Sequence, residues 1–226
     1  MAGRARKILI LGTGGNCRDV LDIILDINAA AGRTLWEPLG FLDDDPARQG
    51  REFCGLPVHG PLSEAARFPD CQLANIIGSP FNHRKKPQVA AKTGAAPERF
   101  ATLVHPTAVV SRWAELGPGC VLFPHVCVHN GARLGAQVIV LSGCVINHDD
   151  VIGDYTFMAS GARVSGEVEV GDCCYLGTGC LIKGNLCIGR GSLVGMGSVV
   201  IRDVAPDSVV AGNPARLLRR YQPQEQ

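Results

Sequence analysis

The segment that determines the fold reads VINHDDVIGDYTFMASGARV over residues 145–164. Within this segment an apolar residue recurs every six positions, at Ile146, Ile152, Met158 and Val164. An α-helix requires a spacing near 3.6 residues and a half-buried strand alternates with a period of two, so neither element explains the pattern. A strict period of six therefore predicts a short strand followed by a corner, repeated along the chain.

The same period extends from Val104 to Val200 without an insertion. Two positions before each apolar residue stands a mostly small residue, and this small-residue column includes four of the ten cysteines, Cys120, Cys144, Cys174 and Cys180. We expect these cysteines to be compact buried hydrophobes rather than disulfide partners. Three hexads close one triangular coil, so residues eighteen apart stack, and the seventeen hexads predict between five and six coils.

Glycine recurs one position after the apolar residue at seven places, Gly117, Gly135, Gly153, Gly171, Gly177, Gly189 and Gly195. Glycine adopts a positive φ without a steric penalty, which other residues do not. We therefore expect these glycines to supply the tight bend at each corner.

Residues 1–98 lack the period of six and predict a small α/β unit. The expected elements are a buried strand, a glycine-rich turn, an amphipathic helix and two further strands, at residues 7–11, 12–16, 17–30, 39–42 and 73–77. This order resembles half of a Rossmann-type sheet, in which ligands bind beyond the carboxyl ends of the strands. We therefore divide the chain into a Rossmann-like unit at 1–98, a repeat domain at 99–215 and a C-terminal tail at 216–226.

The composition is that of a globular protein without a dominant charge. Hydrophobic residues make up 46% of the chain and charged residues 19%, and the formal net charge is +1. Because Lys and Arg are spread along the sequence, we expect no basic face for nucleic acid. The apolar run that ends at Leu11 is too short for a signal peptide or a spanning helix, so we expect a cytoplasmic protein with no membrane partner.

The segment at residues 147–150 departs from the repeat. Asp150 occupies the small-residue column, where a carboxylate requires a hydrogen-bond partner, water or a surface made by another chain. His148 stands beside Asp149 and stacks one coil below Gly166. Acyl transfer from a thioester to a hydroxyl or amine requires a base that works near neutral pH, and an adjacent carboxylate orients an imidazole and supports its basicity. We therefore predict that His148 is the catalytic base, with Asp149 as its partner.

The other histidines bear on a zinc alternative. Some coils of this kind bind zinc through three histidines, as in γ-type carbonic anhydrases, which leaves that class as a rival. His125 and His129 are four residues apart and fall in different columns, so we expect no zinc shared between them and His148 and no bound metal. We expect the remaining histidines, His59, His83 and His105, to be surface or linker residues.

The N-terminal turn predicts a phosphate site. Gly12, Thr13, Gly14, Gly15 and Asn16 lack the third glycine of a dinucleotide fingerprint but precede a helix, whose free N–H groups suit a diphosphate. Asp43 and Asp44, after the next strand, could accept hydrogen bonds from a ribose or a base, or could simply turn the chain. The basic run at residues 83–86 could reach phosphates, although such runs are more often a solvated helix face.

The chain as a whole resembles bacterial hexapeptide-repeat sugar acetyltransferases. The resemblance rests on the GTGG turn, FLDDD, IIGSP, INHDDVIGD and the closing VVAGNPAR. It covers two related kinds of enzyme, the nucleotide-amino-sugar N-acetyltransferases and the sialic acid O-acetyltransferase-like proteins. It implies a left-handed parallel β-helix, a homotrimer, acetyl-CoA lying along the coil between subunits, and a nucleotide-linked sugar held by the N-terminal unit.

The resemblance also assigns roles to individual residues. His148 and Asp149 would be the base and its carboxylate partner, and Gly166 would offer its backbone N–H to the thioester carbonyl. The loop of Gly212, Asn213 and Pro214 would lie near the CoA adenine. Gly12 to Gly15, with Asp43 and Asp44, would hold the nucleotide.

Three residues depart from the family pattern. Asn16 and Phe157 replace histidines that are common in the family, and Leu141 replaces an asparagine. In the family these positions approach the sugar or the acyl group, so the identity of the sugar and the choice between N- and O-acetylation stay open. An inert binding or scaffold protein is a further alternative, although His148 is present.

Overall fold

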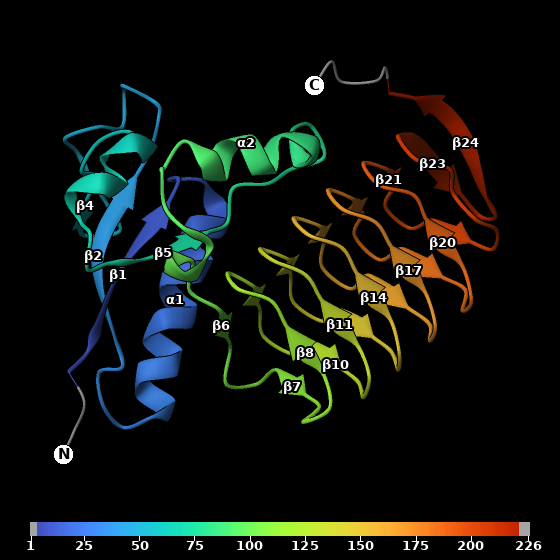
Figure 1. Ribbon diagram of the computed structural model, residues 1–226, viewed down its shortest axis with the longest axis horizontal. Coiled ribbons are helices and arrows are strands. Elements are labelled where there is room, and N and C mark those ends of the chain that lie inside the picture. Colours follow the sequence, from blue (N-terminus) through green and yellow to red (C-terminus); the bar gives the residue numbers. More distant parts are fainter. Residues whose placement is uncertain (1–3, 222–226) are drawn as a thin grey trace.

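The structure is a computed structural model that describes residues 4–221. An N-terminal α/β unit sits at one end of a long coil of short strands (Figure 1). The elements of the N-terminal unit are β1 (Arg6–Leu11), α1 (Gly15–Ala30), β2 (Trp36–Leu42), β3 (Glu52–Phe53), β4 (Leu56–Pro57), β5 (Gln72–Asn75) and α2 (Lys86–Ala91). Three 3₁₀ helices cover Leu62–Arg67, His83–Lys85 and Pro97–Arg99. No helix in the described range is long and apolar enough to cross a membrane.

The coil has three faces, each a sheet whose stacked coil strands are parallel, and we name the faces after their first strands. The β6 face contains β6 (Leu103–Val104), β9 (Val121–Leu122), β12 (Ile139–Val140), β15 (Phe157–Met158), β18 (Tyr175–Leu176), β21 (Leu193–Val194), β23 (Ser208–Gly212) and the antiparallel β24 (Ala215–Arg220). The β7 face contains β7 (Val109–Val110), β10 (Cys127–Val128), β13 (Val145–Ile146), β16 (Arg163–Val164), β19 (Leu181–Ile182) and β22 (Val199–Val200). The β8 face contains β8 (Glu115–Leu116), β11 (Arg133–Leu134), β14 (Val151–Ile152), β17 (Glu169–Val170) and β20 (Cys187–Ile188).

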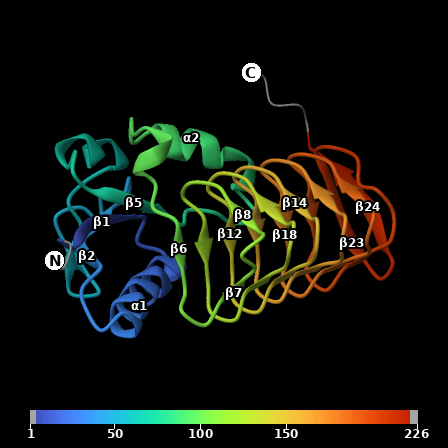
Figure 2. The same cartoon turned by 60° about the horizontal axis from the view of Figure 1, so that its bottom comes forward.

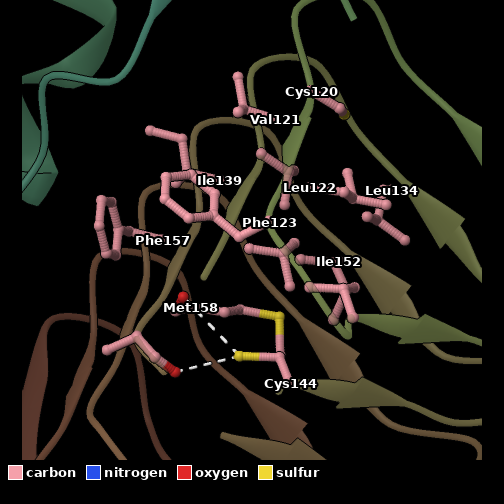
Figure 3. Packing of buried hydrophobic residues seen from close by; sticks show 14 of the residues in the cluster. Cys120, Val121, Leu122, Phe123, Leu134, Ile139, Cys144, Ile152, Phe157 and Met158 are labelled. Atoms are coloured by element: carbon pink, nitrogen blue, oxygen red, sulfur yellow. Dashed lines mark hydrogen bonds between the residues drawn. The ribbon is translucent and has the colours of Figure 1, made fainter. Parts of the chain in front are cut away.

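The stacking of residues eighteen apart is confirmed. Ile146 pairs with Val164, and Ile152 pairs with Val170. Each coil donates backbone hydrogen bonds to the next. The distance between successive coils is therefore that between neighbouring strands of a sheet, about 4.8 Å. The apolar residue of each hexad points into the core, and Figure 3 shows this packing around Met158.

The four cysteines of the small-residue column are buried, as predicted. The Cys144 thiol lies 3.1 Å from Ala159 O, a contact drawn in Figure 3. Burial raises the pKa of Cys144 to about 12, so this thiol stays protonated. All ten cysteines are free thiols, which agrees with a packing role.

The prediction that glycine one position after the apolar residue supplies a positive φ is wrong. Positive φ occurs three positions after the apolar residue, at glycines such as Gly131 and at non-glycine residues such as Asp149. The seven predicted glycines are required for a different reason, the close approach of the next coil. A Cβ on Gly153, for example, would lie 2.6 Å from the backbone N of Asp172.

The N-terminal sheet has the parallel order β2-β1-β5, in agreement with the predicted Rossmann-like unit. Helix α1 packs between this sheet and the first coil (Figure 2). Its Val20 and Ile24 belong to the same continuous core as Leu103 and Val121 of the coil. The segment expected to be a C-terminal tail instead forms β24 up to Arg220, and residues 222–226 lie outside the described residues.

Two histidines and a lysine expected at the surface are buried between the two units. Nε2 of His105 donates to Oδ2 of Asp26 in α1 at 3.0 Å, and His83 contacts Gly191 O at 3.4 Å. Lys86 is only 1% exposed, and burial lowers its pKa to about 7. The prediction of surface histidines and of a solvated or phosphate-reaching basic run is therefore wrong for these residues, because the coil covers them.

The segment at residues 83–86 runs along the corner between the β8 and β6 faces (Figure 1). Lys86 Nζ donates to Gln137 O at 3.3 Å, and Arg84 pairs with Asp207 at 2.9 Å. His83 contacts Gly191 between these two points. The N-terminal unit therefore contacts this corner of the coil from Gln137 near its start to Asp207 near its end.

Replacement of Gly153 by alanine tests the close stacking of coils. The new Cβ would meet the backbone around Asp172, so we expect a loss of about 1–3 kcal/mol in the free energy of unfolding. Gly15→Ala is the matched control, because a Cβ there meets nothing within 4 Å and alanine favours the helix. Chemical denaturation measures both. Equal effects of the two substitutions would contradict the stacking argument.

Candidate active site

His148 lies at the corner between the β7 and β8 faces, which we call the His148 corner and which comprises residues 147–149 and their stacked equivalents. Asn147 fixes this turn, because its Nδ2 donates to Val164 O of the next coil at 2.7 Å. The His148 side chain is 54% exposed, and its Nδ1 lies 3.0 Å from Oδ2 of Asp149. A carboxylate only accepts hydrogen bonds, so this contact assigns the proton of the neutral imidazole to Nδ1 and leaves a lone pair on Nε2.

Gly166 stacks directly over His148. A Cβ at Gly166 would lie 2.5 Å from Nε2 of His148, so only glycine fits above the ring. Within residues 4–221 the Gly166 N–H has no hydrogen-bond acceptor, whereas the Glu167 N–H donates to His148 O at 3.0 Å. A free backbone donor beside a base can stabilise the oxygen of a carbonyl under attack.

Two further residues continue the stack of His148 and Gly166 along the coil. Gly184 follows Gly166, and a Cβ there would lie 2.9 Å from Gly166 O. Arg202 comes next, two residues beyond the pairing of Ile182 with Val200. Three coils at about 4.8 Å place Arg202 roughly 14 Å from His148 along the coil axis. The sequence predictions did not include Arg202, although the eighteen-residue spacing from His148 is a sufficient signal.

Asp150 is paired within the chain, one of the three outcomes expected for it. Its Oδ2 accepts from the Asn147 N–H at 2.8 Å, and its Oδ1 accepts from the Val168 N–H at 3.0 Å. The side chain is fully buried below the His148 turn.

The glycine-rich turn forms the wall of a separate cavity of about 400 Å³ at the carboxyl ends of β1, β2 and β5. Gly12 to Asn16 line this cavity together with Cys17, Asp43 and residues 76–78. Helix α1 begins at Gly15, and no side chain caps its first N–H groups. A Cβ at Gly14 or Gly15 would meet nothing within 4 Å, so the backbone is open to a ligand there. Free N–H groups at a helix N-terminus favour an anion.

The structure separates the two predicted aspartates. Asp43 lines the cavity, and its Oδ2 accepts a hydrogen bond from Thr13 Oγ1 at 2.6 Å. Asp44 points elsewhere: its Oδ2 accepts from Lys92 Nζ at 2.7 Å and its Oδ1 from the Leu62 N–H at 3.0 Å. Partial burial by itself would raise the pKa of Asp44. The hydrogen bonds from Lys92 and Leu62 outweigh this effect and lower the pKa below its ordinary value.

The cavity and the His148 corner lie on opposite sides of the coil. Gly78 of the cavity wall packs against Phe157 on the β6 face. In a triangular cross-section the corner between the β7 and β8 faces is opposite the β6 face. One chain therefore does not bring its own cavity and its own His148 together.

The three departures from the family pattern have different surroundings. Asn16 lines the cavity. Phe157 is buried under it, stacked on Tyr175 with ring centroids 5.4 Å apart, so its ring supports the cavity wall and does not face a ligand within this chain. Leu141 is half-buried at the corner between the β6 and β7 faces, away from the His148 corner.

The loop of Gly212, Asn213 and Pro214 joins β23 to β24 at the far end of the coil. Its residues are exposed, and the Gly212 N–H donates to Ser198 Oγ at 3.1 Å. The loop lies more than three coils beyond His148, so only a long ligand would touch both. Across residues 4–221 no group of three or more His, Cys, Asp or Glu side chains is arranged to hold a metal ion.

A known family model matches the N-terminal part of the chain. Residues 7–85 match the family model described as the PglD N-terminal domain. A UDP-N-acetylbacillosamine N-acetyltransferase of Bacillus subtilis (strain 168) is 32% identical over 119 residues. That match covers 52% of this chain and 51% of the relative, so it spans about half the length of the curated relative.

Solved structures match over nearly the whole chain. The acetyltransferase domain of PglB from Neisseria gonorrhoeae FA1090 is 30% identical, with a TM-score of 0.79 over 94% of this chain and 100% of that one. The same domain has also been solved in complex with acetyl coenzyme A. PerB from Caulobacter crescentus, in complex with CoA and GDP-perosamine, is 28% identical, with a TM-score of 0.78 over 93% and 96% of the two chains.

Proposed function

Because this chain belongs to the hexapeptide-repeat sugar acetyltransferases, we propose that it transfers the acetyl group of acetyl-CoA to the amino group of a nucleotide-linked amino sugar. The observation that carries the proposal is the pairing of His148 and Asp149 under the free N–H of Gly166. An acyl transfer requires a base and an oxyanion donor on either side of one carbonyl carbon, and this corner offers both.

In the proposed reaction the sugar amine attacks the thioester carbonyl directly. The new C–N bond forms as Nε2 of His148 takes a proton from the amine, and Asp149 stabilises the imidazolium through Nδ1–H. The Gly166 N–H donates to the carbonyl oxygen while it carries negative charge. The C–S bond then breaks, and the thiolate of CoA receives the proton from the imidazolium. The products are the N-acetylated sugar and CoA.

The column above His148 suits an extended CoA. Gly166 and Gly184 leave a strip of backbone without side chains, and Arg202 stands at its end. The pantetheine arm has about as many bonds as four residues of extended chain, or roughly 14 Å, which equals the rise from His148 to Arg202. Arg202 would then meet the phosphates, and the loop at 212–214 would lie near the adenine. Acetyl coenzyme A and CoA are bound in the two related structures.

The cavity of the N-terminal unit suits the nucleotide. Its helix N-terminus favours a diphosphate, and Asp43 can accept hydrogen bonds from a ribose or a base. The relatives support an amino sugar, since one is named for UDP-N-acetylbacillosamine and another holds GDP-perosamine. O-acetylation of a sugar such as sialic acid would use the same base, but no comparison favours it.

A shared site requires a second copy of the chain, and we propose a homotrimer. The cavity and His148 lie on opposite sides of one coil, so the cavity of one subunit would present the sugar to His148 of its neighbour. The β7 face beside His148 is suited to contact, because its outward side chains are mostly apolar, namely Val109, Cys127, Val145, Arg163, Leu181 and Val199. The β8 face instead presents Glu115, Arg133, Val151, Glu169 and Cys187.

Replacement of His148 by alanine tests the base. Loss of general base catalysis should lower kcat by about 10²- to 10⁴-fold, measured as release of CoA thiol with acetyl-CoA and a panel of nucleotide-linked amino sugars. Binding of acetyl-CoA, measured by calorimetry, should persist because backbone groups hold the arm. Asp149→Asn should reduce kcat less, because the imidazole stays in place. A His148→Ala enzyme with a near-normal rate and an unchanged acidic limb of its pH profile would refute the assignment.

Substitution in the cavity tests the division of labour between the units. We expect Asp43→Asn to raise KM for the nucleotide-linked sugar about tenfold, because it removes one charged acceptor from the cavity, and to leave KM for acetyl-CoA nearly unchanged. Asp44→Asn should have a smaller effect on the sugar, since that carboxylate pairs with Lys92 outside the cavity. Equal changes in both KM values for Asp43→Asn would argue against a nucleotide site there.

Analytical ultracentrifugation tests the trimer. Wild-type protein should sediment at about three times the monomer mass of 23.9 kDa. Leu181→Glu should dissociate it, because the substitution puts a charge on the apolar β7 face, whereas Cys187→Glu on the β8 face should not. A wild-type mass near that of the monomer at micromolar concentration would rule out the shared site.

A further inference from the structure

Asp150 is the single charged residue in the small-residue column of the repeat. The corresponding residues one coil below and one coil above are Ala132 and Val168, and all three side chains are fully buried. A carboxylate at such a position costs free energy unless its oxygens are hydrogen-bonded. Its presence under the His148 turn therefore requires an explanation.

The Asp150 carboxylate joins two turns of the site. Its Oδ2 accepts from the N–H of Asn147, in the turn that carries His148. Its Oδ1 accepts from the N–H of Val168, in the turn above that carries Gly166. The two bonds, 2.8 Å and 3.0 Å long, therefore fix the base relative to the backbone donor over it.

A neutral side chain makes the same kind of connection elsewhere in this column. Thr156 Oγ1 accepts from the Cys174 N–H of the next coil at 3.1 Å and donates to Gly171 O at 3.0 Å. Ser192 Oγ likewise accepts from the Ser208 N–H at 3.2 Å. A hydroxyl is therefore sufficient to connect the coils, and the charge of Asp150 is not needed for the fold.

The negative charge of Asp150 lowers the stability of the folded state. Burial raises the pKa of Asp150 to about 6, and the hydrogen bonds from Val168 and Asn147 offset this only in part. The titratable groups that act on the carboxylate are His148 and Asp149 of its own turn, while the coil above contributes the Val168 N–H and the coil below the apolar Ala132. Because the folded pKa is above the ordinary value of 3.8, ionisation of Asp150 destabilises the folded state as the pH rises from about 4 to above 6.

We propose that Asp150 is a positioning residue of the acetyl-transfer site, whose buried carboxylate aligns His148 with the Gly166 N–H and adds negative charge that stabilises the imidazolium. This inference rests on the proposed function, since the imidazolium takes part in the reaction only if His148 takes the proton of the nucleophile. It assigns to Asp150 a role distinct from that of Asp149, which contacts the imidazole directly.

The test compares wild-type protein with Asp150→Thr. The substitution copies Thr156, so it keeps an acceptor for the Val168 N–H and removes the charge together with the oxygen that accepts from the Asn147 N–H. We expect kcat for acetyl transfer to fall on the order of tenfold, with KM for acetyl-CoA within about twofold of wild type. We expect the midpoint of thermal unfolding at pH 8 to be equal to or above that of wild type, with the difference shrinking below about pH 6 as Asp150 takes up its proton.

A matched substitution and a readout without turnover complete the test. Ala132→Ser, one coil below, adds a hydroxyl to the same column away from His148 and should leave kcat near wild type. The NMR titration of the His148 imidazole, assigned by comparison with His148→Ala, should move by several tenths of a pH unit toward lower pH in Asp150→Thr, because a neighbouring negative charge is lost. This titration can be measured even if no sugar is acetylated. Absence of acetylation would refute the proposed function, whereas the titration tests separately whether the charge of Asp150 acts on His148.

Two outcomes would overturn the role of Asp150. An unchanged kcat together with an unmoved His148 titration would show that the charge does not act on the base. A fall in the unfolding midpoint at pH 8 in parallel with kcat would show that Asp150 serves the fold.

Discussion

Every feature of the coil depends on the backbone hydrogen bonds between residues eighteen apart. They stack Ile146 on Val164 and thereby place Gly166 directly over His148. The same close stacking requires glycine at positions such as Gly153, where the next coil leaves no space for a Cβ. It also buries Asp150 between two turns, so the chemistry of the His148 corner is fixed by the repeat and not by a local loop.

The proposed site is built from two structurally distinct parts. The base, the oxyanion donor and the strip above them belong to the coil, where each turn is held by the turns on either side. The cavity proposed for the nucleotide is formed by three loops at the ends of β1, β2 and β5, and its Gly78 wall packs on the coil through Phe157. Under the proposed function, exchange of loop residues such as Asn16 would alter the sugar site without disturbing the coil that carries His148.

The sequence predicted what depends on a period and missed what depends on contacts between the units. The spacing of apolar residues was sufficient for the coil, for the stack of His148 under Gly166 and for the buried cysteines, because each follows from counting along the chain. His83 and Lys86 have no such period, and their burial follows from a docking geometry that the sequence does not encode locally. Asp43 and Asp44 are adjacent and chemically alike, so only the path of the chain after β2 decides which one lines the cavity.

The segment at residues 83–86 changes how the coil can come apart. In a solenoid each repeat contacts only the neighbouring repeats, so the array can open one repeat at a time from an end. Here the distal end is held by Arg84, which pairs with Asp207 and lies over the ring of Tyr221, while Lys86 contacts Gln137 near the opposite end. Opening of the last coil therefore also breaks contacts of the α/β unit, so we expect these contacts to couple the unfolding of the distal coil to that of the α/β unit.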